Sequence, residues 1–291
     1  MIIVRLKGGR GNQMFQYALG RALSLKNDTI LKLDTTYLEN KTKRKNFTFR
    51  NFDLSIFNIK AEIAKTSDLP FFYRFLNGRF VFIFEALVNK FKLGGGLEKK
   101  FSFNENILNL KDGAYVSGYW QSPKYFSEIE STIRNDFSLK ELPLQNIQDK
   151  AHEIKNTDSV CIHVRRGDYV GNPFYDVTDL DFYKKGIDLI RSQKNISKIY
   201  VFSDDIDWCK ENLKFDIETF FVDDSFNGDK NEGTMYLMSF CKNFVISNST
   251  FAWWGAWLAP SSDKIVVCPK RWFGDDIIDT SDLIPKEWIR I

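Results

Sequence analysis

From residue 159 onward, the chain alternates between short apolar segments and longer amphipathic ones. Apolar segments with the length and β-branched content of strands occur at 159–164, 198–202, 218–222, 243–247 and 264–269. Segments with apolar residues at helical spacing separate them, near 180–193, 206–213, 231–241 and 251–258. Such alternation is typical of a parallel sheet with helices on both faces. We therefore predict a doubly wound α/β domain in this half.

Polar side chains follow three of these predicted strands. They are the pairs Arg165 and Arg166, Asp204 and Asp205, and Ser249 and Thr250. The carboxyl ends of parallel strands meet at one edge of a sheet, so these side chains are expected to lie together. Adjacent guanidinium groups at the end of a buried strand need an anion, which a phosphate or a set of surface acids would supply. A carboxylate in the same set can accept the paired N–H groups of guanine. Together these residues predict a binding site for a nucleotide diphosphate.

The first half opens with a strand at 2–7, a glycine-rich turn and an amphipathic helix. The turn reads Gly8-Gly9-Arg10-Gly11-Asn12-Gln13, which lacks the third glycine of a dinucleotide signature. Its glycines would also serve simple close packing. The amides of Asn12 and Gln13 can meet a substrate hydroxyl or a phosphate oxygen without adding charge.

The middle of the chain gives weaker signals. Residues 40–50 form a basic loop, and 52–111 predict helices of uncertain register. The aromatic-rich stretch 71–91 predicts a core-packing helix pair or, alternatively, a surface for a membrane or partner. A strand and aromatic loop at 115–123 can line a sugar site or belong to the core. The composition of 141–146 suggests a linker, so we expect domains at 1–147 and 148–291.

Composition excludes several classes of protein. A net charge of +3 does not by itself favour nucleic-acid binding. Two histidines exclude a His-rich metal centre, and the four separated cysteines predict buried free thiols. The strand-like start and the absence of an apolar run of about 18 residues argue against a signal peptide and a membrane span. We expect a cytoplasmic protein.

Three motifs resemble those of the alpha-1,2-fucosyltransferases of glycosyltransferase family 11. They span residues 8–18, 163–169 and 247–258, and they occur in the family's order. The resemblance implies a GT-B-like fold, two Rossmann-like domains with the nucleotide bound mainly by the second, and the acceptor held by the first. It also implies GDP-β-L-fucose as donor, the 2-hydroxyl of a terminal β-galactoside as acceptor, inversion at the anomeric carbon, and neither a metal nor a cofactor.

The resemblance also implies roles for individual residues. Arg165 would hold the β-phosphate, and His163 and Asp205 would contact guanine. The turn at Ser249, Thr250 and Phe251 would meet the diphosphate, and Asn12 would face the sugar end of the donor. Two positions depart from the family's usual pattern, Arg10 and Asn243, and they bear on acceptor choice.

The proton acceptor is left open by the sequence. Asp168 and Glu232 are candidate bases, although the leaving diphosphate can also take the proton. Asp168 more simply orients the arginines. The acid pair Asp205 and Asp207 would suit a metal, but we expect the arginines to neutralise the phosphates.

Other functions remain as alternatives. A different GDP-fucose-dependent linkage fits the same motifs. A glycoside hydrolase would use the acid pairs at 204/205, 223/224 or 275/276, and a glycan-binding protein would use the aromatic residues. We expect no nucleic-acid partner, and a peripheral membrane contact is left as an alternative.

Overall fold

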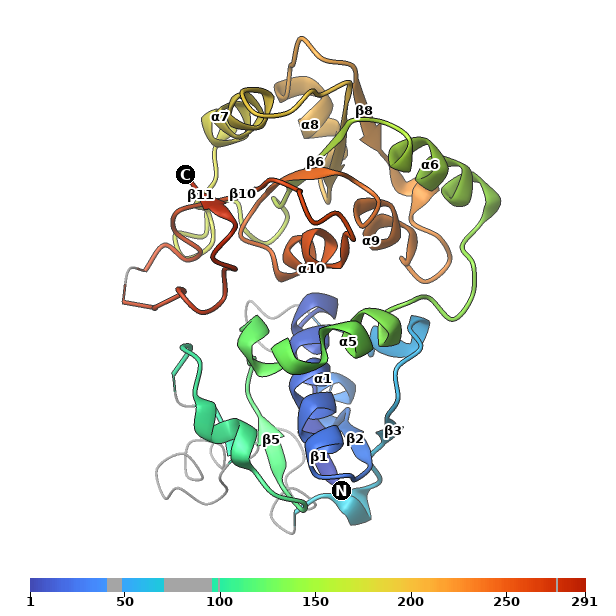
Figure 1. Ribbon diagram of the computed structural model, residues 1–291, viewed down its shortest axis with the longest axis vertical. Coiled ribbons are helices and arrows are strands. Elements are labelled where there is room, and N and C mark those ends of the chain that lie inside the picture. Colours follow the sequence, from blue (N-terminus) through green and yellow to red (C-terminus); the bar gives the residue numbers. More distant parts are fainter. Residues whose placement is uncertain (41–48, 71–95, 99, 276) are drawn as a thin grey trace. The chain divides into compact units, whose positions relative to one another are not determined.

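The computed structural model describes residues 1–40, 49–70, 96–98, 100–275 and 277–291. The chain forms two compact units (Figure 1). The first unit comprises Met1–Lys140 and Ser281–Leu283, and the second comprises Glu141–Thr280 and Ile284–Ile291. The predictions for the stretch 71–91 and for most of the basic loop lie outside the described residues. Contact with a membrane surface therefore stays a prediction.

The first unit is built on a parallel sheet with the strand order β3-β2-β1-β5-β4. Its strands are β1 (Ile2–Arg5), β2 (Leu31–Asp34), β3 (Glu62–Ile63), β4 (Gly96–Leu97) and β5 (Tyr115–Ser117). Helix α1 (Arg10–Lys26) packs on β1 and β2 and buries one apolar face, including Phe15 and Leu19. The short helices α2 (Thr36–Glu39) and α5 (Glu130–Asp136) belong to the same unit.

The helices predicted over 52–111 are wrong for the part of that segment that is described. It contains the 3₁₀ turns η1 (Leu54–Ile56), η2 (Thr66–Asp68) and η3 (Glu105–Asn109), together with β3 and β4. Asp and Asn side chains bind the local backbone here, which favours turns over helix. The Asp68 carboxylate accepts from the Lys65 N–H, and the Asn104 side chain accepts from the Asn106 N–H. Two further turns, η4 (Pro123–Tyr125) and η5 (Ser127–Ile129), precede α5.

The second unit contains the doubly wound parallel sheet that the alternation predicts. Its strands are β6 (Ser159–Val164), β7 (Lys198–Ser203), β8 (Thr219–Val222), β9 (Asn243–Ile246), β10 (Val266–Cys268) and β11 (Ile289–Arg290). Helices α7 (Leu180–Arg191) and α8 (Ile206–Asn212) cover one face, as Figure 1 shows. The other face carries α6 (Gln145–Lys155), α9 (Gly233–Met238) and α10 (Thr250–Leu258). The 3₁₀ turn η6 (Asp224–Phe226) follows β8, and β11 was not predicted.

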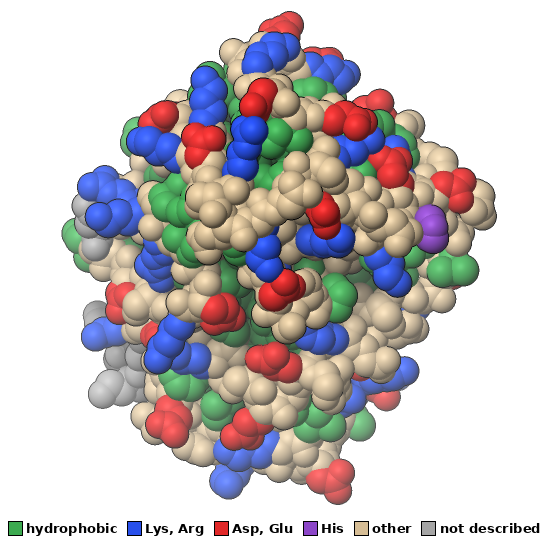
Figure 2. Space-filling view, turned by 45° about the horizontal axis from the view of Figure 1, so that its top comes forward, with side chains coloured by type: hydrophobic (Ala, Val, Ile, Leu, Met, Phe, Trp, Pro, Cys, Tyr) green, Lys and Arg blue, Asp and Glu red, His purple; other side chains and the backbone are tan. Residues whose placement is uncertain are grey.

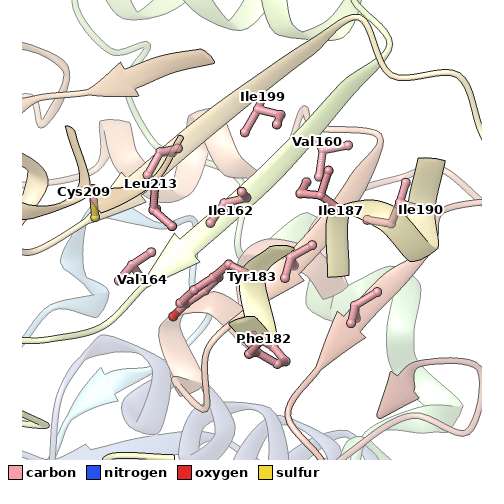
Figure 3. Close-up of a cluster of buried hydrophobic side chains, with 13 residues drawn as sticks. Val160, Ile162, Val164, Phe182, Tyr183, Ile187, Ile190, Ile199, Cys209 and Leu213 are labelled. Carbon is pink, nitrogen blue, oxygen red and sulfur yellow. The ribbon is translucent and has the colours of Figure 1, made fainter. Parts of the chain in front are cut away.

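Alternate residues of β6 face opposite sides of this sheet. Val160, Ile162 and Val164 pack with apolar side chains of α7 and α8 (Figure 3). Because side chains alternate along a strand, Cys161 and His163 point to the other face. Three residues of β6 therefore pack into the core on one side of the sheet, and His163 points toward α10 on the other side.

The second sheet has a switch point, where the chain leaves two adjacent strands in opposite directions. In this sheet β6 lies between β7 and β9, and the chain runs outward from it on both sides in turn. In the first sheet β1 lies between β2 and β5, but the chain enters β5 from the edge strand β4. Ligands of open α/β sheets bind in the crevice outside the strand ends at a switch point. We therefore look for function first after β6 and β9, and then at the polar segments after β1 and β5.

The surface and the cysteines agree with the sequence. Basic and acidic side chains are interspersed over the face shown in Figure 2, in keeping with 41 basic and 38 acidic residues. All four cysteines are buried and free, which confirms that prediction. None of the helices in the described ranges is long and apolar enough to cross a membrane.

Candidate active site

Arg165 stands at the end of β6 between two carboxylates. Its Nε and Nη2 donate to Asp168 Oδ1 at 2.9 and 2.6 Å, and Nη1 lies 3.2 Å from Asp204 Oδ2. Burial alone would lower the pKa of Arg165, but Asp204 and Asp168 outweigh it, and the pKa is raised. A guanidinium has five N–H groups. Among the described residues, Asp168 and Asp204 face three of these N–H groups. One N–H on Nη1 and one on Nη2 are therefore left for a ligand.

Arg166 is held by a second acid and by an aromatic ring. Its Nε donates to Asp205 Oδ2 at 2.9 Å, and its guanidinium carbon lies 3.7 Å from the centre of the Trp208 ring. Asp205 also begins α8, where its other carboxylate oxygen accepts from the Trp208 N–H at 3.3 Å. The structure thus gives Asp205 two protein partners. Its predicted contact with guanine stays a prediction.

Asp204 organises the turn that follows Arg165, whereas the sequence placed it only among the strand-end residues and gave it no role. Its Oδ1 accepts from the Arg166 backbone N–H at 2.9 Å, and its Oδ2 accepts from the Gly167 N–H at 3.0 Å. A side chain at Gly167 would place its Cβ 2.5 Å from Asp204 Oδ2 and would therefore displace this carboxylate. The position of Asp204 at the end of β7, next to β6, is the signal that points to it.

His163 is buried on the α10 face of the second sheet. Its Nδ1 lies 3.0 Å from Ser247 Oγ, and its ring centre lies 6.1 Å from that of Phe251. Burial, and then the neighbouring Arg165 charge, lower the pKa of His163 to about 4. The imidazole is therefore neutral near pH 7, where it can donate and accept hydrogen bonds without adding charge.

The segment after β9 crosses the same edge of the sheet. Ser249 is the N-cap residue of α10, and Thr250 and Phe251 form its first turn. Backbone N–H groups at a helix N-terminus favour an anion. Asn248 is buried and its Nδ2 donates to the carbonyls of Tyr175 and Trp272, at 3.0 and 2.9 Å. It therefore joins the loops that border this edge, a role that no sequence pattern indicated.

The two arginines and three aspartates of this edge carry a net formal charge of minus one. The acids fix the direction of the guanidinium groups at the cost of part of their attraction for an anion. The amino end of α10 adds a partial positive charge, about half a unit. We therefore regard orientation, more than total charge, as what this edge offers a phosphate.

In the first unit the glycine turn supports a cluster of amides. Gly8 has φ +77°, and a Cβ there would lie 2.4 Å from Asn12 Nδ2. Asn12 Oδ1 accepts from Gln121 Nε2 at 2.8 Å, which links the loops that follow β1 and β5. Gln13 does not fit the predicted contact with a substrate. Its Nε2 donates to the Gly8 and Asn51 carbonyls, and its Oε1 accepts from the Asp53 N–H.

Two other acids that the sequence proposed have local partners. Glu232 Oε2 accepts from the Lys230 N–H at 2.9 Å and closes the turn before α9. Asp207 pairs with Lys210 at 3.0 Å, whereas Asp205 pairs with Arg166. No group of three or more His, Cys, Asp or Glu side chains suited to a metal occurs within the described ranges.

The structure therefore brings most of the predicted site residues to one edge. His163 lies near the end of β6, and the residues that follow β6, β7 and β9 of the second sheet are Arg165, Asp168, Asp205, Ser249, Thr250 and Phe251. Asn12 lies in the first turn of α1, after β1 of the first sheet. The individual roles of these residues stay predictions.

Two units, each built on a parallel α/β sheet with polar side chains beyond the strand ends, form a GT-B-like fold. The fucosyltransferase NodZ from Bradyrhizobium shares this fold, with a TM-score of 0.52 and 13% identity over 90% of this chain and 95% of that one. The family model for Glycosyl transferase family 11 matches residues 97–291, about two thirds of the chain. The chain belongs to glycosyltransferase family 11.

Two relatives cover nearly all of the chain. An alpha-1,2-colitosyltransferase of Escherichia coli is 31% identical over 100% of this chain and 99% of its own length. A galactoside 2-alpha-L-fucosyltransferase of Caenorhabditis elegans is 25% identical over 98% of this chain and 74% of its own length. The resemblance that the motifs carry and the fold that they imply are therefore confirmed.

Proposed function

We propose that the protein transfers L-fucose from GDP-β-L-fucose to the 2-hydroxyl of a terminal β-galactoside, with inversion and without a metal. Family membership and the named galactoside fucosyltransferase support the reaction. The observation that carries it is Arg165, held between Asp168 and Asp204 with N–H groups left over for a ligand. We assign the nucleotide to the second unit and the acceptor to the first.

Arg165 would act on the leaving group. The acceptor oxygen forms a bond to the fucosyl anomeric carbon while the bond from that carbon to the β-phosphate oxygen breaks. The electron pair of the broken bond stays on the diphosphate, whose charge therefore grows. A guanidinium already fixed in direction stabilises that growing charge more than it stabilises the bound donor.

The acceptor proton has two destinations in this proposal. It passes either to the departing diphosphate or to a carboxylate. Asp168 Oδ1 already accepts two N–H groups from Arg165, which favours an orienting role for this residue. Glu232 closes its own turn. We therefore favour the diphosphate as the proton acceptor.

The remaining assignments concern the rest of the donor. His163, neutral and buried beside Ser247, suits a hydrogen bond to the guanine ring, with Asp205 as its proposed companion. Ser249, Thr250 and Phe251 would meet the diphosphate at the start of α10. Asn12 would contact the sugar with an uncharged amide.

Transfer of colitose is a second candidate, because a relative of full length and 31% identity is a colitosyltransferase. Colitose is L-fucose without its 3-hydroxyl group. A site that hydrogen-bonds the 3-hydroxyl strongly rejects a donor without it. An apolar pocket discriminates far less between the two donors. The two donors therefore test whether this site binds the 3-hydroxyl.

The test is incubation with GDP-fucose or GDP-colitose and galactose-terminated acceptors in excess chelator, followed by linkage analysis. We expect a 1,2-linked fucosyl product and equimolar GDP. No transfer to any terminal β-galactoside contradicts the acceptor assignment, and loss of activity that Mg²⁺ restores contradicts metal independence. Sugar release without GDP would instead indicate a hydrolase.

A further inference from the structure

The loop that follows β5 contains an unusual turn. Trp120 is buried, and its φ of +56° lies in the left-handed region, which a bulky residue rarely adopts. Such a conformation persists only where the surroundings impose it, and it occurs most often at functional sites. The turn follows β5, which pairs with β1, and the hydrogen bond from Gln121 to Asn12 joins it to the segment after β1.

A carboxylate at the end of β4 imposes this conformation. Glu98 Oε2 accepts from the Tyr119 N–H at 2.7 Å, and its Oε1 accepts from the Trp120 N–H at 2.9 Å. The Trp120 ring packs edge-on against Tyr125, with ring centres 5.7 Å apart. Each contact fixes the backbone immediately before Gln121. The direction of the Gln121 side chain is therefore set by the contacts of Glu98 and Trp120.

Gln121 itself contributes little to the fold. Its side chain is buried, and Nε2 donates to Asn12 Oδ1 at 2.8 Å. Its Oε1 is buried and has no hydrogen-bond partner among the described residues. A buried acceptor without a partner is destabilising, so an apolar residue of similar size would suit the fold about as well. The fold therefore does not explain why an amide occupies position 121. The hydrogen bond to Asn12 does.

We propose that Gln121 is a positioning residue that sets the direction of the Asn12 side-chain amide, and that Glu98 holds Gln121 in place for this purpose. The inference rests on the proposed contact of Asn12 with the donor sugar. In the structure Gln121 Nε2 donates to Asn12 Oδ1, so the amide nitrogen of Asn12 is directed elsewhere. In this proposal that nitrogen is the donor to the sugar, and a reversed Asn12 amide would present an acceptor in its place.

The test compares Gln121→Leu, Gln121→Glu, Asn12→Ala and the double variant Asn12→Ala/Gln121→Leu. We expect Gln121→Leu to lower kcat about ten- to a hundredfold with little change in Tm, because small misplacements of a contacting group cost that much. Gln121→Glu is expected to be equally slow, since its carboxylate attracts the Asn12 nitrogen and reverses the amide. In the Asn12→Ala background, Gln121→Leu should change kcat less than twofold.

A matched control is Asn27→Leu. Asn27 also donates through its side-chain amide, to the Leu23 and Leu110 carbonyls, but it lies at the other end of α1, about 22 Å along the helix. This variant should lower Tm and keep kcat. Glu98→Gln, which loses one acceptor for the turn, should lower kcat in the native background and have little effect beside Asn12→Ala.

The outcomes separate the inference from the function on which it rests. If Asn12→Ala is slow and Gln121→Leu is either normal or additive with it, the positioning role is wrong and the role of Asn12 stands. A Gln121→Glu enzyme at the native rate also overturns the positioning role. If Asn12→Ala turns over at the native rate, the proposed role of Asn12 fails, and the inference fails with it.

Discussion

The polar edges of the two parallel sheets have opposite chemistry. In the second sheet the loops after β6 and β7 are joined by ion pairs, in which Arg165 and Arg166 contact three aspartates. In the first sheet the loops after β1 and β5 are joined by two neutral amides, Asn12 and Gln121. At each edge the polar side chains bind one another.

The difference matches the two ends of a sugar nucleotide. Bond breaking adds charge to the diphosphate, and fixed charges stabilise such a change most. The sugar carries hydroxyl groups, for which amides offer both donors and acceptors without the desolvation penalty of an ion. The comparison therefore predicts that substitutions at the ionic edge have larger effects on the rate than substitutions at the amide edge.

Replacing Arg165 should give the largest effect. Arg165→Ala removes the guanidinium proposed to stabilise the leaving diphosphate, and we expect kcat to fall a hundred- to a thousandfold, about 3–4 kcal/mol. Steady-state transfer with GDP-fucose measures it. The control is Arg191→Ala, which breaks an exposed pair with Asp216 and should leave kcat and stability nearly unchanged. An Arg165→Ala enzyme that keeps its kcat would remove the basis of the comparison.

The pH dependence of stability tests the neutral state of His163. Its pKa is about 4 in the folded protein, below the ordinary 6.5, so the unfolded chain binds a proton first as the pH falls. This contribution to stability is complete above pH 6.5 and is lost between 6.5 and 4, by up to about 3 kcal/mol. Denaturant unfolding from pH 7 to pH 4 measures it.

The matched variants for that experiment are His163→Gln and His152→Gln. His163→Gln should remove the His163 contribution, so its difference from the native protein should shrink as the pH falls. His152 is exposed on α6, and its replacement should leave the native slope in place. Equal slopes for the native protein and His163→Gln would mean that the buried imidazole does not resist protonation.

Two glycines with positive φ test the amide edge. Gly8 and Gly113 have φ +77° and +86°, but only at Gly8 would a Cβ meet Asn12, whereas nothing lies within 4 Å at Gly113. Both Gly8→Ala and Gly113→Ala should lower stability by about 1–2 kcal/mol because of backbone strain. Only Gly8→Ala should also lower kcat, by about tenfold, because Asn12 must move. Equal kcat values would show that Asn12 is not part of the reaction.

The sequence predicted most of the second sheet because five of its six strands are marked locally. The strand predicted at 198–202 ends one residue later, at Ser203, and the helix predicted near 180–193 spans Leu180–Arg191. Periodic burial specifies such elements within a few residues. Strand β11 was missed because it contains only two residues and is defined by its pairing with β10.

The site was harder to predict because its contacts connect distant residues. Gln121 and Asn12 are 109 positions apart, and only the strand order β1-β5 brings them together. Asp204 and Asp205 are adjacent and identical in type, so the sequence cannot tell which one holds the Arg166 backbone and which holds its guanidinium. The register of β6 against β7, which pairs Val164 with Ser203, decides this.

Replacing Asp168 should give the smallest effect, and it tests how the ionic edge works. Asp168→Asn keeps an oxygen that can accept from Arg165 but removes the charge, and the pair is partly exposed, so we expect kcat to fall less than tenfold, about 1 kcal/mol. If Asp168 is the base, the loss should be a hundred- to ten-thousandfold. Measuring kcat and GDP affinity together separates these outcomes. An orienting acid changes both slightly, whereas a base changes kcat alone.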